Sequence, residues 1–196
     1  MKQINSIKDI KETDSYAIFM RHGNRDKIPE GVFGNEVELN SLGEQRAFEY
    51  GQSLQHLNIR HIYTSPVKRC IQTAEHIVRG LSREVPIEIS TILGEPGAFV
   101  HDGKTAGQNF LKLGMREMYY TLVRREEIEG FRNLNEGSEL LNNFFIEQAK
   151  APGVNIYVSH DLLVALYKFH CYNRLHTFED WVGYLEGPII HINSEP

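Results

Sequence analysis

The apolar run Tyr16-Ala17-Ile18-Phe19-Met20 is the feature that most constrains the fold of this chain. A short run without polar alternation is typical of a strand buried on both faces, as in a parallel sheet covered by helices. Other candidate strands lie at 59–63, 85–92, 155–158 and 188–192. Between them, apolar residues recur at helical spacing in segments near 41–54, 66–79, 115–128, 138–150 and 161–170. We expect Ser138 to cap the helix over 138–150. Strands that alternate with helices predict an α/β fold, a three-layer sandwich with a mostly parallel central sheet flanked by helices.

The length and composition of the chain favour one domain. It has 196 residues, of which 41% are hydrophobic and 24% charged, as is usual for a globular domain with one sizeable core. We find no linker, repeat or low-complexity segment, and therefore expect a single domain over 1–196. Residues 96–137 carry a mixed, glycine-interrupted signal, which we interpret as an insertion or cap over one side of the fold.

Charge and cysteine content limit the partners and the compartment. The formal net charge is −5 without a basic run, which argues against a nucleic-acid partner. Cys70 and Cys171 form no closely spaced pair, so reduced thiols in a cytoplasmic protein are the simplest interpretation. No apolar run reaches the roughly 18 residues that a membrane span requires, and 1–15 lack the apolar core of a signal peptide. We expect a cytoplasmic protein with no membrane partner.

Polar clusters follow four of the predicted strands. They are Arg21-His22, then Thr64-Ser65-Pro66 leading to Arg69, then Glu95, and finally Ser159-His160-Asp161. In open α/β sheets, ligands bind beyond the carboxyl ends of the strands. We therefore expect these side chains to meet at one edge of the sheet.

The residue types in this set suit phosphoryl transfer. Arginine guanidinium groups bind phosphoryl oxygens in a bidentate manner, and a histidine at a helix N-terminus adds a donor where anions are favoured. Another histidine can act as a nucleophile, and a carboxylic acid can protonate the leaving oxygen. Such a set can transfer a phosphoryl group without a metal, so no cofactor is expected.

Three segments together resemble the histidine phosphatase superfamily, which has the phosphoglycerate mutase-like fold. They are Met20-Arg21-His22-Gly23, the stretch from Ser65-Pro66 through Arg69 to Gln72-Thr73-Ala74, and Ser159-His160. The second has the form S-P-x-x-R-x-x-Q-T-A and is the most specific of the three. The resemblance covers most of the chain and is weakest over residues 96–150.

The resemblance implies a role for each matching residue. His22 would become phosphohistidine, and Arg21, Arg69 and His160 would surround the phosphoryl group. Asn24 and Arg25 occupy substrate-contacting positions, although they depart from the glutamate or glutamine followed by threonine of many relatives.

Two residues are candidates for the proton donor. Glu95 resembles the glutamate that one branch of the superfamily has after the third strand. Asp161 resembles the aspartate that follows the second histidine in the acid-phosphatase branch. We favour Glu95, because the chain is small like members of the first branch, and keep Asp161 as the alternative.

The predicted function is that of a phosphomonoesterase acting on a phosphorylated small molecule or phosphoprotein. The nearest alternative is phosphoglycerate mutase-type transfer, which usually needs additional basic contacts over the cleft. Six basic residues in the 96–137 segment are dispersed rather than clustered: Lys104, Lys112, Arg116, Arg124, Arg125 and Arg132. Two further alternatives stay open. The pairs His101-Asp102 and His160-Asp161 would suit a metal-dependent HD-type phosphohydrolase. A protein that kept the pocket without turnover would be a non-catalytic phosphate-binding module.

Overall fold

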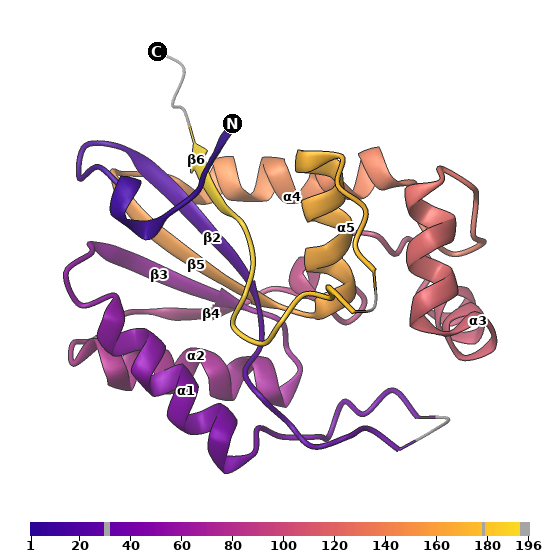
Figure 1. The fold of residues 1–196 in the computed structure, drawn as a ribbon, viewed down its shortest axis with the longest axis horizontal. Coiled ribbons are helices and arrows are strands. Elements are labelled where there is room, and N and C mark those ends of the chain that lie inside the picture. Colours follow the sequence, from indigo (N-terminus) through magenta and orange to yellow (C-terminus); the bar gives the residue numbers. More distant parts are fainter. Residues whose placement is uncertain (30–31, 178, 193–196) are drawn as a thin grey trace.

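The computed structural model describes residues 1–29, 32–177 and 179–192. The elements in chain order are β1 (Lys2–Ile4), β2 (Ser15–Arg21), α1 (Ser41–Ser53), β3 (Ile59–Thr64), α2 (Lys68–Leu81), β4 (Ile87–Ile89), α3 (Gly103–Val123), α4 (Leu134–Gln148), β5 (Gly153–Ser159), α5 (Asp161–Tyr172) and β6 (Ile189–Ile192). Short 3-10 helices lie at Ile7–Asp9 and Thr91–Leu93. The fold is α/β, as the sequence predicts (Figure 1).

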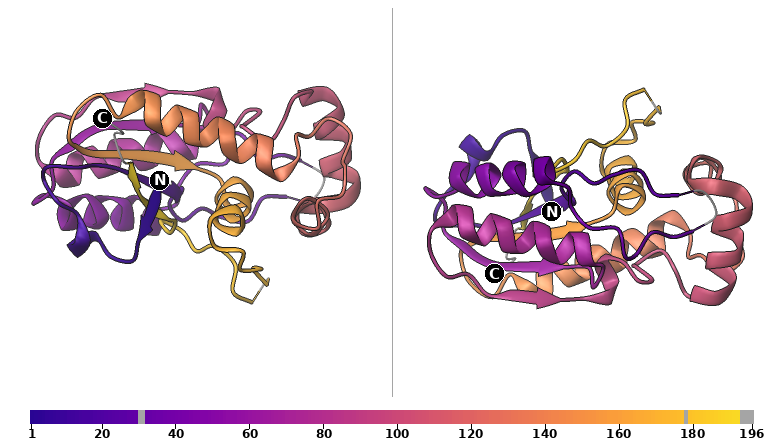
Figure 2. Two further views of the ribbon diagram at one scale, coloured as in Figure 1. Left: turned by 90° about the horizontal axis from the view of Figure 1, so that it is seen from above. Right: turned by 90° about the horizontal axis from the view of Figure 1, so that it is seen from below.

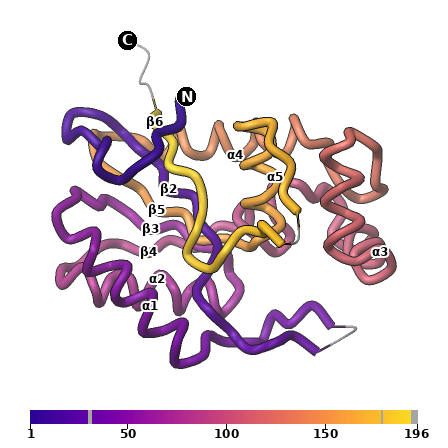
Figure 3. The backbone as a smooth tube through the Cα atoms, viewed as in Figure 1, coloured from indigo at the N-terminus to yellow at the C-terminus, as the bar shows by residue number. Residues whose placement is uncertain are grey.

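One sheet runs through the molecule in the order β1-β6-β2-β5-β3-β4. Figure 3 labels the part of this order from β6 to β4. Strands β2, β5, β3 and β4 are parallel neighbours, whereas β6 pairs antiparallel with β2 and β1. Opposite Ser159 of β5 lies Arg21 of β2, and opposite Val158 lies Thr64 of β3. The three strands therefore end level with one another.

Helices cover both faces of the sheet, which gives the expected three layers (Figures 1 and 2). Side chains alternate along β2: Ile18 and Met20 belong to the core beneath α1 and α2, and Phe19 belongs to the core beneath α4 and α5. Every residue of β5 is buried. Burial on both faces explains why these strands have almost no polar alternation in the sequence.

Helix α3 corrects the expectation of a helix over 115–128. It spans Gly103–Val123 and changes direction at Gly114, whose φ of 74° and ψ of 161° are not helical. Glycine adopts this backbone without a Cβ clash. In Figures 1 and 2, α3 lies at one end of the molecule, beyond α5.

The start of α4 corrects the prediction of Ser138 as its cap. The helix begins four residues earlier, after Asn133, whose side chain accepts the N–H of Glu136 while the Glu136 carboxylate accepts the N–H of Asn133. This capping box satisfies two N–H groups that the helix itself leaves without partners. Ser138 lies buried within α4. No helix of the described residues is long and apolar enough to cross a membrane.

Candidate active site

The level strand ends bring the predicted residues of distant segments together. His22 follows β2 and is only 2% exposed, and its N–H donates to the carbonyl of Ser159 at 2.9 Å. His160 follows β5 as the N-cap of α5, and the two imidazole rings meet edge to face with centroids 5.6 Å apart. Arg69 lies in the first turn of α2, after β3. The parallel register thus converts separate motifs into one site.

The hydrogen bonds of His22 define its tautomer. Nδ1 lies 2.8 Å from the carbonyl oxygen of Gly23, which can only accept, so Nδ1 carries the proton. On the other side, Nε of Arg69 donates to His22 Nε2 at 3.0 Å. Burial, followed by electrostatic interaction with His160 and with the Arg69 cation, lowers the pKa of His22 well below its usual range. The ring is therefore neutral at neutral pH, and its Nε2 lone pair accepts the Arg69 N–H.

Arg69 connects the elements of the site. Besides its bond to His22, Nη1 donates to the carbonyl of Gly34 at 2.7 Å and Nη2 donates to Nδ1 of His160 at 3.3 Å. Behind it, the Thr73 hydroxyl donates to the Arg69 carbonyl and accepts the Gly23 N–H. These hydrogen bonds fix the orientation of the guanidinium plane, which contacts both histidines.

His160 has the opposite tautomer. Because Nδ1 accepts from Arg69, Nε2 carries the proton and donates to the Ser65 hydroxyl at 2.9 Å. Burial and then the charge of Arg69 lower the pKa of His160 well below its usual value. Gly94 lies against this pair: a Cβ there would come within 2.5 Å of His160 Cδ2 and 2.7 Å of the Ser65 hydroxyl oxygen. His160 is a neutral donor in a fixed orientation.

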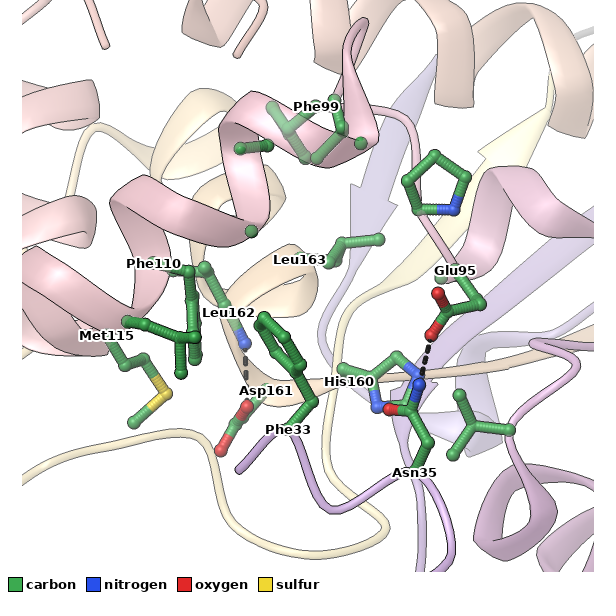
Figure 4. A pocket seen from close by; sticks show the side chains of 18 of the residues that line it. Phe33, Asn35, Glu95, Phe99, Phe110, Met115, His160, Asp161, Leu162 and Leu163 are labelled. Carbon is green, nitrogen blue, oxygen red and sulfur yellow. Dashed lines mark hydrogen bonds between the residues drawn. The ribbon is translucent and has the colours of Figure 1, made fainter. Parts of the chain in front are cut away.

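The two candidate acids have different surroundings. The Asp161 carboxylate pairs with Nη2 of Arg21 at 3.0 Å, with side chains only 16% and 11% exposed, and it also accepts the Leu162 N–H. Glu95 is exposed and accepts from the Asn35 amide at 2.6 Å, as Figure 4 shows. The Asp161 carboxylate forms an ion pair with Arg21, whereas among the described residues Glu95 pairs with no cation.

A cavity of about 880 Å³ borders the site. His22, Arg25, Arg69, Glu95, His160 and Asp161 line it, so the structure brings together six of the eight predicted site residues. Figure 4 shows His160, Glu95 and Asn35 close together and a group of apolar side chains beside them. The volume is within the range of small-molecule sites.

Two predicted residues do not line the cavity. The Arg21 guanidinium lies against Asp161, the Val182 carbonyl at 2.7 Å and the ring of Tyr184 at 4.1 Å. Asn24 faces Arg46, whose Nη1 donates to the Asn24 side-chain oxygen at 3.4 Å. Direct contact of either residue with a phosphoryl group stays a prediction.

Sequence reasoning missed several residues that build the site. Ser65 begins the S-P-x-x-R-x-x-Q-T-A segment, so the sequence does indicate that it lies near the site where it bonds His160. Asn35, Val182 and Tyr184 had none, because they lie in irregular segments that tertiary structure brings to the site.

The His101-Asp102 pair has a structural place outside the cavity lining. Asp102 is the N-cap of α3 and accepts the N–H groups of Lys104 and Thr105. His101 is exposed. Across the described ranges no three His, Cys, Asp or Glu residues gather in a way that could hold a metal ion.

A parallel sheet with histidine and arginine side chains at its carboxyl edge is an arrangement suited to binding a phosphoryl group. The family model of the histidine phosphatase superfamily (branch 1) matches residues 17–110, which include His22, Arg69 and Glu95. A curated 2,3-bisphosphoglycerate-dependent phosphoglycerate mutase of Thermoplasma acidophilum is 27% identical over 147 residues, 74% of this chain and 70% of the relative. Both matches support the assignment of the chain to the histidine phosphatase superfamily.

Solved structures share the phosphoglycerate mutase-like fold. Bacillus stearothermophilus YhfR superposes with a TM-score of 0.60 at 17% identity, over 92% of both chains. A phosphoglycerate mutase of Bacillus anthracis gives 0.55 at 19% identity, over 85% of this chain and 86% of the other. A mycobacterial glucosyl-3-phosphoglycerate phosphatase gives 0.53 at 17% identity, over 79% and 78%. The named neighbours include a mutase and a phosphatase, so similarity alone does not distinguish phosphoryl transfer from hydrolysis.

Proposed function

We propose that this protein is a phosphomonoesterase that works through a covalent phosphohistidine on His22. The observation that carries the proposal is the state of His22. Gly23 holds its Nδ1–H, and Nε2 faces Arg69 at 3.0 Å in a cavity that His160 also lines. A neutral imidazole oriented in this way is an activated nucleophile.

The reaction has two half-steps. In the first, a phosphoryl oxygen accepts the Arg69 N–H in place of His22 Nε2, and the freed Nε2 lone pair attacks phosphorus. The bond from phosphorus to the ester oxygen breaks, and a carboxylic acid gives its proton to the leaving oxygen. In the second, water attacks phosphorus, returns a proton to the carboxylate and breaks the bond to Nε2. Arg69 and His160 offer N–H groups where negative charge develops on the phosphoryl oxygens.

Glu95 is our choice of proton donor. It lies in the cavity wall with Asn35 as its partner, whereas the Asp161 carboxylate is occupied by Arg21 and the Leu162 N–H. We assign Asp161 the task of positioning Arg21.

The cavity wall favours hydrolysis over mutase chemistry. Of the six basic residues between 96 and 137, only Lys104 lines the cavity. Arg124 pairs with Glu117 and Glu126, and Arg132 donates to the carbonyls of Ala98 and Val100. A mutase must retain and re-orient a charged intermediate, and this wall supplies few cations for that task.

Phosphate release from 4-nitrophenyl phosphate tests the proposal. His22→Ala should abolish turnover, whereas His101→Ala, at an exposed histidine outside the cavity lining, should retain it. Mass spectrometry of enzyme quenched in alkali should locate the phosphate on the peptide that contains His22. Turnover in His22→Ala, or a phosphate on another residue, would contradict the mechanism, and isomerisation of 3-phosphoglycerate without phosphate release would favour the mutase.

A further inference from the structure

The cavity has two chemically different ends (Figure 4). His22, Arg69 and His160 form the polar end described above. Most of the remaining wall is hydrocarbon, and it includes Phe33, Phe99, Phe110, Met115, Leu162 and Leu163. A phosphoryl group at the polar end therefore leaves the organic part of its ester against an apolar surface.

The apolar wall is continuous with the phosphate site. Leu162 and Leu163 directly follow His160 and Asp161, so the first turn of α5 passes at once from polar to apolar side chains. The ring of Phe33 also lines the cavity and lies 5.9 Å from the ring of Phe110 of α3. These two rings come from different segments of the chain.

Polar groups that could bind a hydrophilic tail are few on this wall. Lys104 and Gln108 line it from the exposed face of α3. The other polar side chains near it have partners: Asp161 pairs with Arg21, Arg25 Nη1 donates to the carbonyl of Asp26, and the amide of Asn35 is bonded to Glu95. Polar groups that leave water without new hydrogen bonds lose free energy, so a sugar or carboxylate tail gains little here.

We propose that the natural substrate is a monophosphate ester of an apolar alcohol, with an alkyl or aryl group filling the apolar end of the cavity. This inference rests on the proposed hydrolysis at His22 and names the substrate class of that site. Apolar pockets with a few polar groups at one end bind ligands whose shape and polarity match in the same order.

A series of n-alkyl phosphates from ethyl to octyl, with phosphate release as the readout, tests this inference. Burial of each methylene should raise kcat/KM about twofold to fourfold until the apolar end is full. The substrate 3-phosphoglycerate should be turned over more slowly than butyl phosphate. A flat or falling series would overturn the inference.

Two leucines of α3 provide a matched pair of variants. Leu111 lines the cavity and is 51% exposed, whereas Leu113, two residues along, is 38% exposed and does not line it. Leu111→Gln should reduce the gain per methylene, and Leu113→Gln should keep it. An equal reduction in both variants would mean that the alkyl chain does not occupy this cavity.

Ethyl phosphate separates the two proposals. If the enzyme hydrolyses ethyl and octyl phosphate equally well, the substrate class is wrong and the phosphatase mechanism stands. If neither they nor 4-nitrophenyl phosphate are hydrolysed and His22 is not phosphorylated, the proposed function itself fails.

Discussion

Glu95→Gln and Asp161→Asn should have opposite signatures, because their carboxylates have different partners. Glu95 is exposed, so its replacement should change the free energy of unfolding by no more than about 0.5 kcal/mol. As the proton donor, it should contribute about 10²–10⁴ in kcat on alkyl phosphates, whose alkoxides need a proton. On 4-nitrophenyl phosphate, whose phenolate leaves without one, the loss should be small.

For Asp161→Asn, the effect should appear chiefly in stability. The ion pair with Arg21 spans 3.0 Å, and its side chains are only 16% and 11% exposed. Exposed pairs contribute about 0–1 kcal/mol, and removing one member of a buried pair costs about 3–5 kcal/mol. Since asparagine keeps an oxygen for the Leu162 N–H, we expect a loss of about 2 kcal/mol. The loss of kcat/KM should be similar for good and poor leaving groups.

Urea unfolding and a leaving-group series measure both effects on the same preparations. A matched control is Glu38→Gln, which removes an exposed partner of Lys68 and should change neither quantity appreciably. The assignment would be refuted if Asp161→Asn unfolded like the parent and lost activity only on poor leaving groups, since Asp161 would then be the acid.

Three further predictions concern the histidines and their supports. Folding lowers the pKa values of His22 and His160, so between about pH 6.5 and these lower values the unfolded state binds more protons than the folded state. The free energy of unfolding should therefore fall on acidification by up to about 1.4 kcal/mol per pH unit for each histidine. Denaturant unfolding at several pH values should show this fall, with a smaller slope in His22→Gln. In Gly94→Ala, the new Cβ would displace His160 from Ser65. Because small misplacements of catalytic groups cost about 10²-fold in rate, kcat should fall more than tenfold. Steady-state kinetics with an unchanged kcat would contradict this contact. Arg69→Lys keeps the charge but loses the planar arrangement that reaches His22, Gly34 and His160, so kcat/KM should fall about 10²-fold, and near-parent activity would mean that charge alone is sufficient.

The phosphate-facing half of the site was predictable from the sequence. The buried strands β2 and β5 are visible as apolar runs, and the polar residues that follow each run must lie at the same edge of a parallel sheet. That rule requires no side-chain detail. It placed His22, Arg69 and His160 together although 47 residues separate the first two and 91 the last two.

The segments that reach the cavity from outside the sheet were less predictable. Glycines at 103, 107 and 114 obscure the helical pattern of α3, and the angle of this helix depends on Gly114, which no local propensity specifies. The cap of α4 was misplaced because Ser138 resembles a capping residue, whereas Asn133 and Glu136 satisfy the terminal N–H groups in both directions. Likewise, the contacts of Arg21 with Asp161 and Tyr184 join β2 to segments that lie much later in the chain.

This difference follows from how the two ends of the cavity are held. The polar end is fixed by β2, β3 and β5, whose in-register hydrogen bonds leave the strand ends almost no freedom. The apolar end is held by side-chain packing, such as Phe33 against Phe110, between segments that share no backbone ladder. Packing tolerates exchange of one apolar side chain for another of similar volume, whereas a hydrogen-bonded register does not tolerate a shift by one residue. Substitutions in α3 and in the segment around Phe33 should therefore change which phosphate ester is accepted while leaving the chemistry at His22 in place.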